Sequence, residues 1–250
     1  MIDSQIDIGI DGLPLHTRFV ERDSASTLLV LMPSAVGGDT AHRHPAYARW
    51  QWADHFPHAH VMAIADPAMG SHESLRGAWY MHAEADVITA IAAAITPIVD
   101  RLQVDRVVAY GSSLGGFGAL ALAAALPRTT AIAEVPQIDF ARWLGSAKVA
   151  VETHILGDDL ESHRTRHPHQ VSVEARFLAA GRVPPYVIVS NVLDHSYRDQ
   201  LELHEWVCRQ EDVPREGRHE LRIVDEALGH GPLSLASARA LIEERLLVAP

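Results

Sequence analysis

The sequence predicts an α/β fold: one open, mostly parallel, twisted sheet of about eight strands, with helices on both faces. Short apolar runs alternate along the chain with longer segments that have apolar residues at helical spacing. A parallel sheet covered by helices needs strands that are buried on both faces, and such runs have that composition. The 250 residues, 48% of them hydrophobic, also suffice for one sheet of this type and its core.

Six apolar runs are the candidates for parallel strands. Most are bounded by proline, glycine or a turn, which are typical signals of a strand end. They comprise residues 27–32, 60–65, 105–110, 130–135, 186–190 and 220–224. Two earlier segments, 6–10 and 15–20, alternate between apolar and polar residues, and we expect them to form an antiparallel pair at one edge of the sheet.

Helices are expected between the strands, where the apolar period changes. They comprise residues 83–102, 114–126, 197–210 and 234–247. Pro97 should kink or divide the first of them, since proline cannot donate a backbone hydrogen bond. The irregular stretch 139–183 is too long for one crossover loop. We interpret it as a small cap or lid, with its own helix near 173–180, inserted into a single domain that covers residues 1–250.

The strongest chemical signal is the sequence Gly-Ser-Ser-Leu-Gly-Gly at 111–116, which fits the pattern G-x-S-x-G around Ser113. Such a serine sits on a tight strand-to-helix turn that lifts its hydroxyl above the sheet. Larger side chains two residues to either side would collide in that turn. An apolar run ends just before Gly111 and a small-residue helix follows Ser113, which is the context the motif requires. The alternative is a glycine-rich turn whose serine is only structural.

The segment 111–118 resembles the nucleophile elbow of the α/β-hydrolase superfamily, particularly that of esterases with the form G-x-S-[ML]-G-G-[FY]. The order of strands and helices resembles that fold from about residue 15 to residue 247. The resemblance implies a serine hydrolase with Ser113 as nucleophile. It also implies that the acid and then the histidine follow the serine along the chain.

Candidates for the base and the acid stand at the places that this order requires. His230 lies between two glycines after the last strand, where the superfamily carries its catalytic histidine. Asp194 lies just past the preceding strand and would orient the imidazole. Asp199, one helical turn further on, and Asp139, after an earlier strand, remain alternative acids. An acidic helix cap is the structural alternative for Asp194.

An oxyanion hole needs two backbone amides that point at the carbonyl oxygen of the reacting group. The amide of Leu114, directly after the nucleophile, is the first candidate. The second should come from the loop 33–38, where we expect Ser34 or Ala35 to donate. This loop lacks the superfamily's His-Gly-Gly signature, and its own two glycines come late.

The loop after residue 67 leaves the carboxyl end of a strand and should border the cleft. Trp79 and Tyr80 could stack on a flat or sugar-like group of the substrate, and Arg76 could meet an acidic one. The equally weighted alternative is that the two aromatic rings cover the edge of the sheet. The histidine-rich segment 163–169 is expected to be a solvated lid loop, since no regular metal site accompanies it.

The composition and the motifs together favour an enzyme that acts on a small molecule without a cofactor or metal. The net charge is −11 with no basic stripe, which argues against a nucleic-acid partner. No run approaches the ~18 apolar residues of a membrane span, and acidic residues stand where a signal peptide needs positive charge. We therefore predict a cytoplasmic enzyme with no membrane partner; the oligomeric state stays open.

The leading functional hypothesis is hydrolysis of a carboxylic ester or thioester through an acyl-enzyme on Ser113. An acyltransferase with the same Ser113, His230 and Asp194 is one alternative. A hydrolase-like scaffold that binds a partner without catalysis is another. The fold cannot choose among substrates, because one such frame hosts many reactions.

Overall fold

The computed structural model describes residues 1–36 and 44–247, so the two glycines at 37 and 38 lie outside the described residues. This described part contains one eight-stranded sheet with the order β1-β2-β4-β3-β5-β6-β7-β8. The strands are β1 Ile2–Ile6, β2 Leu15–Val20, β3 Thr27–Leu31, β4 His60–Ile64, β5 Arg106–Ser112, β6 Thr129–Glu134, β7 Tyr186–Asn191 and β8 His219–Val224. From β4 to β8 all neighbours are parallel, whereas β1 and β2 form an antiparallel edge. The predicted fold class is confirmed.

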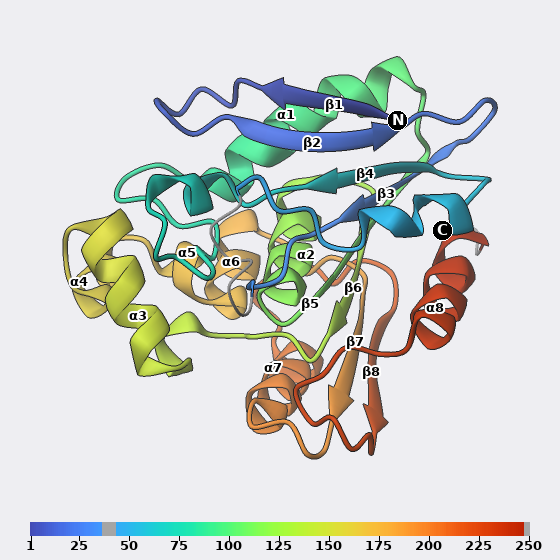
Figure 1. Cartoon of the computed structure of the whole chain (residues 1–250). Coiled ribbons are helices and arrows are strands. Elements are labelled where there is room, and N and C mark those ends of the chain that lie inside the picture. Colours follow the sequence, from blue (N-terminus) through green and yellow to red (C-terminus); the bar gives the residue numbers. More distant parts are fainter. Residues whose placement is uncertain (37–43, 248–250) are drawn as a thin grey trace.

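Helices cover both faces of this sheet (Figure 1). The α-helices are α1 Val87–Arg101, α2 Leu114–Ala125, α3 Gly145–Val151, α4 Leu160–Arg166, α5 Pro168–Val171, α6 Val173–Ala180, α7 Tyr197–Arg209 and α8 Leu235–Leu247. The 3₁₀-helices are η2 Trp50–His55, η3 Pro67–Ser71 and η4 Phe140–Arg142, and η5 Glu152–Leu156 is a π-helical turn. One core joins the sheet to α1, α2, α6 and α7, and a second joins it to η2 and α8. Within the described residues, no helix is both long and apolar enough to cross a bilayer.

The side chains of β3 show why the parallel strands are apolar throughout. Leu28 and Val30 belong to the core on the α1 and α2 side, whereas Leu29 and Leu31 belong to the core on the α8 side. All four are at most 1% exposed. Successive strand residues point to opposite faces, so a strand covered on both sides buries every one of them.

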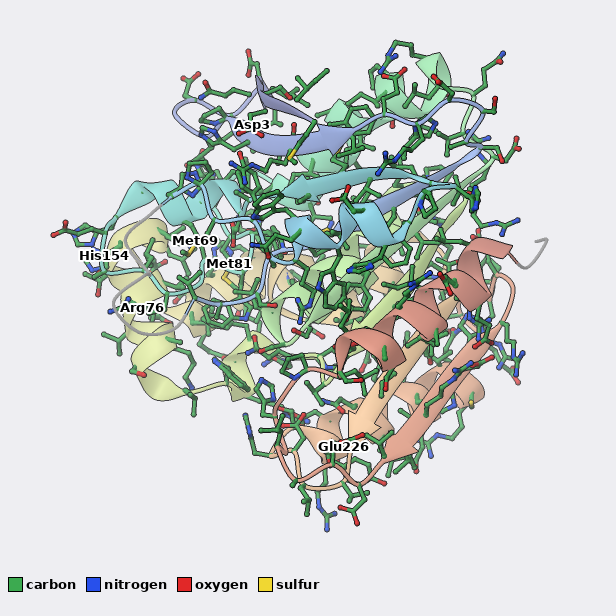
Figure 2. All side chains as sticks on the ribbon, turned by 45° about the vertical axis from the view of Figure 1, so that its right-hand side comes forward. Asp3, Met69, Arg76, Met81, His154 and Glu226 are labelled. Atoms are coloured by element: carbon green, nitrogen blue, oxygen red, sulfur yellow. The ribbon has the colours of Figure 1, made fainter. Side chains whose placement is uncertain are left out.

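The first strand lies earlier in the chain than the alternation at 6–10 predicted. β1 is an exposed edge strand at Ile2–Ile6 and pairs with β2. Asp3 marks β1 in Figure 2, and Glu226, which follows β8, marks the opposite edge of the sheet. Residues 7–13 form a turn instead, in which Gly9 and Gly12 have positive φ. Ile8 in this turn packs into the core, so the apolar alternation came from a buried turn.

Helix α1 is continuous through Pro97, contrary to the expectation that this proline would kink or divide it. Proline removes one hydrogen bond, the one that the carbonyl of Ala93 would accept. Both Ala93 and Pro97 lie on the exposed face of α1. Water can solvate the carbonyl there, and the helix therefore persists.

The segment between β6 and β7 carries η4, α3, η5, α4, α5 and α6, and α6 covers the residues predicted for it (Figure 1). The histidine-rich segment 163–169 is not the solvated loop that we expected. Asp159 caps α4, and Pro168 ends the run and opens α5 at its first turn, where its missing N–H is not needed. His163 is fully buried in this arrangement.

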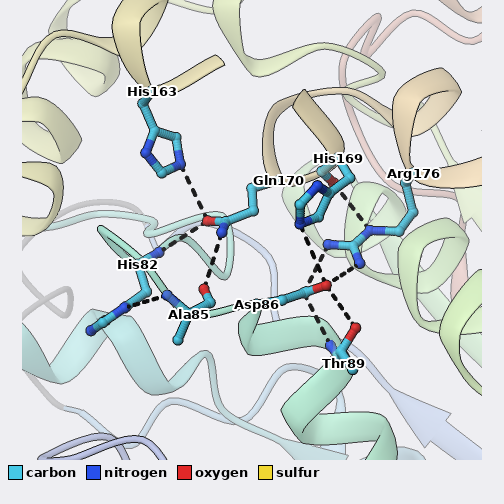
Figure 3. A network of polar contacts seen from close by, with 8 residues as sticks. All are labelled: His82, Ala85, Asp86, Thr89, His163, His169, Gln170 and Arg176. Atoms are coloured by element: carbon cyan, nitrogen blue, oxygen red, sulfur yellow. Dashed lines mark hydrogen bonds and ion pairs between the residues drawn. The ribbon is translucent and has the colours of Figure 1, made fainter. Parts of the chain in front are cut away.

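A partly buried ion pair joins this segment to the start of α1 (Figure 3). Asp86 caps α1 and accepts two hydrogen bonds from the guanidinium of Arg176, at 2.6 and 2.9 Å. The side chain of Arg176 is only 5% exposed. Burial opposes ionisation of Asp86, but the hydrogen bonds from Arg176 and Thr89 outweigh it and lower its pKa to about 2.

We expect Asp86→Asn to reduce the free energy of unfolding by about 2 kcal/mol at pH 7, the value of a pKa shift of this size. Asparagine caps a helix as well as aspartate does, so the change removes mainly the charge. The folded-state pKa lies below the unfolded value of 3.8, so the contribution is complete above that pH and lost as pH falls toward 2.

Urea unfolding of both proteins between pH 7 and pH 3 measures this difference. Asp3→Asn is the matched control, because Asp3 pairs with Arg18 at the surface and its loss should change stability less. The loss of unfolding free energy in Asp86→Asn should be larger at pH 7 than at pH 3 and larger than the loss in the control. If either is not the case, the stabilising role of the Asp86 charge is contradicted.

Candidate active site

Ser113 sits on a strained turn between β5 and α2. Its backbone angles are φ 55° and ψ −119°, outside the regions that a serine ordinarily adopts. A Cβ atom on Gly111 would lie 2.2 Å from the carbonyl oxygen of Gly115. One on Gly115 would lie 2.8 Å from the carbonyl oxygen of Pro33. Only glycines fit at these two positions, because β5, α2 and the end of β3 meet within van der Waals contact.

The side chains of Ser113, Asp194 and His230 form one hydrogen-bonded chain. Nε2 of His230 lies 2.8 Å from Oγ of Ser113, and Nδ1 of the same ring lies 2.9 Å from Oδ1 of Asp194. They come from the elbow, from the turn after β7 and from the loop after β8. In this geometry the imidazole can accept the serine proton on one nitrogen while the carboxylate orients the other.

Asp194 is kept ionised by the donors around it. Burial opposes its charge, but hydrogen bonds from His230 and from the backbone N–H of Ser196 lower its pKa below the usual value. Nε2 of the fully buried Gln200 donates to Oδ2 of Asp194 at 2.8 Å and to the carbonyl oxygen of Pro136 at 3.0 Å. The hydroxyl of Ser190 donates to the oxygen of the same amide. Gln200 therefore joins β6, β7 and α7 beneath the carboxylate.

The loop that carries His230 is anchored by a second buried carboxylate, Glu134 at the end of β6. It accepts a hydrogen bond from the hydroxyl of Tyr110 at 2.5 Å and one from the backbone N–H of Leu233 at 3.3 Å. Burial raises the pKa of Glu134, and the hydrogen bond from Tyr110 lowers it by less. Leu233 follows His230 by three residues, so Glu134 restrains the position of the imidazole.

The first residues after β3 lie beside the elbow, as the contact between Pro33 and Gly115 requires. The hydroxyl of Ser34 donates to the carbonyl oxygen of Ser112 at 3.0 Å. Leu114 is the first residue of α2, and the helix makes no use of its N–H. A small cavity of about 10 Å³ is lined in part by Ser34 and Leu114. The oxyanion donors expected at Leu114, Ser34 and Ala35 therefore belong to segments that meet here.

Trp79 and Tyr80 do not offer a stacking surface to a substrate. Each is 2% exposed and belongs to the main core, because the chain folds back there under the end of β4. The buried carboxylate of Asp66 accepts the backbone N–H of Tyr80 and holds this segment. Arg76 is exposed (Figure 2). It lies on a loop whose His72 stacks against His154.

The two alternative acids lie in other ion pairs. Asp199 pairs with Arg142 at 2.5 Å, and Asp139 pairs with Arg164 at 2.9 Å. Asp139 also caps η4. Of the three candidate carboxylates, the structure brings only Asp194 to the imidazole of His230.

Sequence reasoning missed the amides around the site, above all Gln137. This residue is 1% exposed, and its Nε2 lies 3.0 Å from Oγ of Ser113. Its only signal was its position directly after β6, at the carboxyl end of a parallel strand. An amide carries no charge, and neither Gln137 nor Gln200 lies in a motif that would mark it.

Among the described residues, one group of three or more potential metal ligands lies close together: Asp194, His195 and His230, within 4.8 Å of one another. Nδ1 of His195 and Nδ1 of His230 lie 3.3 and 2.9 Å from the same carboxylate oxygen. The contact of His230 is a hydrogen bond to Asp194, whereas His195 lies at ion-pair distance from the same carboxylate. Trp143, whose ring centroid is 5.1 Å from that of His230, covers the same side of the site.

No family model and no curated protein matches the chain. Solved structures do. A capsule O-acetyltransferase of Neisseria meningitidis serogroup A superposes with a TM-score of 0.68 at 17% identity, over 95% of this chain and 96% of that one. The esterase Est2 of Thermogutta terrifontis superposes with a TM-score of 0.61 at 17% identity, over 98% and 91%. The chain has the α/β-hydrolase fold.

The same fold recurs in a longer protein. A chain of the glycosylation-associated Gap123 complex of Streptococcus agalactiae superposes with a TM-score of 0.68 at 16% identity. The match covers 98% of the present chain but only 46% of that protein, so this chain spans just under half of its length. In the present α/β-hydrolase fold, Ser113, Asp194 and His230 all follow the carboxyl ends of parallel strands, where this kind of sheet gathers its reactive groups.

The packing of Gln200 gives a test of how the site is supported. We expect Gln200→Leu to reduce the free energy of unfolding by about 2 kcal/mol or more, because it removes the buried donor to Oδ2 of Asp194 and to the carbonyl oxygen of Pro136. Urea unfolding measures the change. Gln51→Leu, at an exposed position of η2, is the matched control. Equal free energies of unfolding for both variants would show that the amide of Gln200 does not contribute this stability.

Proposed function

We propose that the protein cleaves a carboxylic ester or thioester of a small molecule through an acyl-enzyme on Ser113. The observation that carries the proposal is the chain of two short hydrogen bonds from Ser113 through His230 to Asp194. A serine hydroxyl is a weak nucleophile until a positioned base removes its proton. Here the base is in contact, and its far nitrogen faces an ionised carboxylate.

The reaction follows from these positions. The proton of Ser113 passes to Nε2 of His230 while Oγ forms a bond to the carbonyl carbon, whose π electrons move to the oxygen. Collapse of this intermediate expels the alcohol or thiol, which takes the proton from His230, and leaves the acyl group on Oγ. Water then repeats both steps and frees the serine. Asp194 stabilises the imidazolium in each half-reaction.

The oxyanion of each intermediate would be bound at the start of α2. The backbone N–H of Leu114 is the first donor in this proposal, and an N–H of Ser34 or Ala35 is the second. The partial positive charge at the amino end of α2 adds to them. We also propose that residues 139–183 act as a cap, since Trp143 in this segment lies beside His230.

Transfer of the acyl group to an acceptor other than water is the competing outcome. The solved structures of this fold described above include both an O-acetyltransferase and an esterase, so the same fold serves both reactions. The two share every step up to the acyl-enzyme. Products formed from an activated ester in the presence of competing alcohols separate them, because only transfer yields a new ester.

Ser113→Ala should lower kcat/KM for p-nitrophenyl acetate by about 10³-fold or more, since it removes the nucleophile. It should also abolish labelling by a fluorophosphonate, which mass spectrometry of the wild type should place on Ser113. Ser237→Ala, on the exposed start of α8, is the control and should label normally. Turnover or labelling of Ser113→Ala at the wild-type rate would refute the proposal and favour a binding scaffold.

The identity of the acid can be tested by paired substitutions. Asp194→Asn should lower kcat on the order of 10³- to 10⁴-fold, because it removes the charge that stabilises the imidazolium. Asp199→Asn should retain most of the activity, since Asp199 pairs with Arg142 and does not contact His230. Steady-state kinetics of the two variants decides between them, and the reverse order of effects would assign the acid to Asp199.

A further inference from the structure

Oγ of Ser113 has a second partner besides the imidazole. Nε2 of Gln137 lies 3.0 Å from it, and the backbone N–H of Gln137 donates to the carbonyl oxygen of Ser113 at 3.2 Å. The side chain is 1% exposed, so this amide stands at the nucleophile with little access to water. Side chain and backbone thus bind Gln137 to the elbow at two points.

Trp79 fixes which way the amide of Gln137 points. Its indole Nε1–H donates to Oε1 of Gln137. An indole nitrogen can only donate, so the amide oxygen must face Trp79 and the NH₂ group must face Ser113. Burial at 2% exposure leaves the indole N–H dependent on this acceptor.

The backbone is held in unusual conformations on both sides of this contact. Trp79 has φ 52° and Val135 has φ 37°, and positive φ is rare for residues with such side chains. Asp66 retains the first segment through the N–H of Tyr80, and the N–H of Val135 donates to the carbonyl oxygen of Val189 in β7. Strained backbone conformations persist only where the surrounding structure enforces them, and they are concentrated at functional sites.

We propose that Gln137 is a further catalytic residue, which donates to Oγ of Ser113 throughout the reaction, and that Trp79 is its positioning residue. This inference rests on the function proposed above. In the resting site the hydroxyl donates to His230 and accepts from Gln137, which leaves one lone pair of Oγ free to attack the carbonyl carbon. Gln137 transfers no proton. When the acyl-enzyme breaks down, its N–H stabilises the oxygen that leaves the acyl carbon.

Gln137→Met tests the donor, since methionine keeps the length of the side chain but cannot donate. We expect kcat/KM for p-nitrophenyl acetate, which reports acylation, and the rate at which the acetyl-enzyme is hydrolysed each to fall about 10- to 100-fold. The first would fall because the hydroxyl is less well oriented, and the second because the leaving oxygen loses one hydrogen bond. Gln170→Met is the matched control, because Gln170 is also buried but bonds to His82, Ala85 and His163 instead of Ser113 (Figure 3). It should lose stability and keep its activity.

Trp79→Phe tests the positioning role by removing only the indole N–H. The expected loss is smaller than for Gln137→Met, because the amide remains but can turn. In the Gln137→Met background the same change should have no further effect on kcat/KM, since Trp79 acts through Gln137. Independent losses that multiply in the double variant would overturn this part of the proposal.

Gln137→Glu gives a pH-dependent readout that a merely structural residue would not produce. An ionised carboxylate can only accept, so it would draw the hydroxyl of Ser113 away from His230, whereas a protonated one can donate as the amide does. The ratio of this variant's kcat/KM to that of the wild type should therefore rise as pH falls. The same ratio for Gln137→Met should stay flat, because methionine does not titrate.

The possible results separate this inference from the proposed function. If Ser113→Ala is inactive but Gln137→Met, folded by circular dichroism, retains wild-type kcat/KM, the role of Gln137 is refuted and the acyl-enzyme stands. If Ser113→Ala is fully active, both fail. Should Gln137→Met not fold, the wild-type kcat/KM of a folded Trp79→Phe variant would refute the proposal on its own.

Discussion

The hydroxyl of Ser113 stands above the sheet because three backbone segments approach one another more closely than side chains would allow. Gly111 meets Gly115 across the turn, and Gly115 meets the carbonyl of Pro33 at the end of β3. A larger residue at either glycine would push α2 away from the sheet. The hydroxyl of Ser113, the backbone N–H of Leu114 and the loop after β3 would then separate together, so the geometry of the whole site depends on this packing.

Parallel pairing brings the remaining groups to the same place. The carboxyl ends of the five strands β3, β5, β6, β7 and β8 lie on the same side of the sheet. The segment that follows each strand contributes one group there, in the same order: Ser34, Ser113, Gln137, Asp194 and His230. Residues separated by more than a hundred positions, such as Ser113 and His230, meet because only β6 and β7 lie between their strands, β5 and β8. The antiparallel pair β1 and β2 extends the opposite side of the sheet and adds no group to the site.

The predictable parts of the molecule were those with a local signal. Apolar runs located the parallel strands, and the glycines around Ser113 located the elbow, because each feature depends on neighbours in sequence. β1 was misplaced since an exposed edge strand needs no apolar pattern, whereas the turn at Ile8 has one. Trp79 and Gln137 could not be assigned, because their burial and pairing depend on how α2, β4 and β6 pack together.

The buried polar side chains that support the site cost folding free energy, and this cost is informative about the function of the site. Gln137 and Gln200 are neutral amides buried in contact with Ser113 and Asp194, and Glu134 is a carboxyl whose pKa burial raises. An apolar core without them would be easier to stabilise, because each polar group must find partners to offset its desolvation. Their donors and acceptors converge on one serine, one imidazole and one carboxylate. This arrangement holds the hydroxyl of Ser113 in one orientation, which supports the nucleophilic role that we propose for it over a scaffold that only binds a partner at its surface.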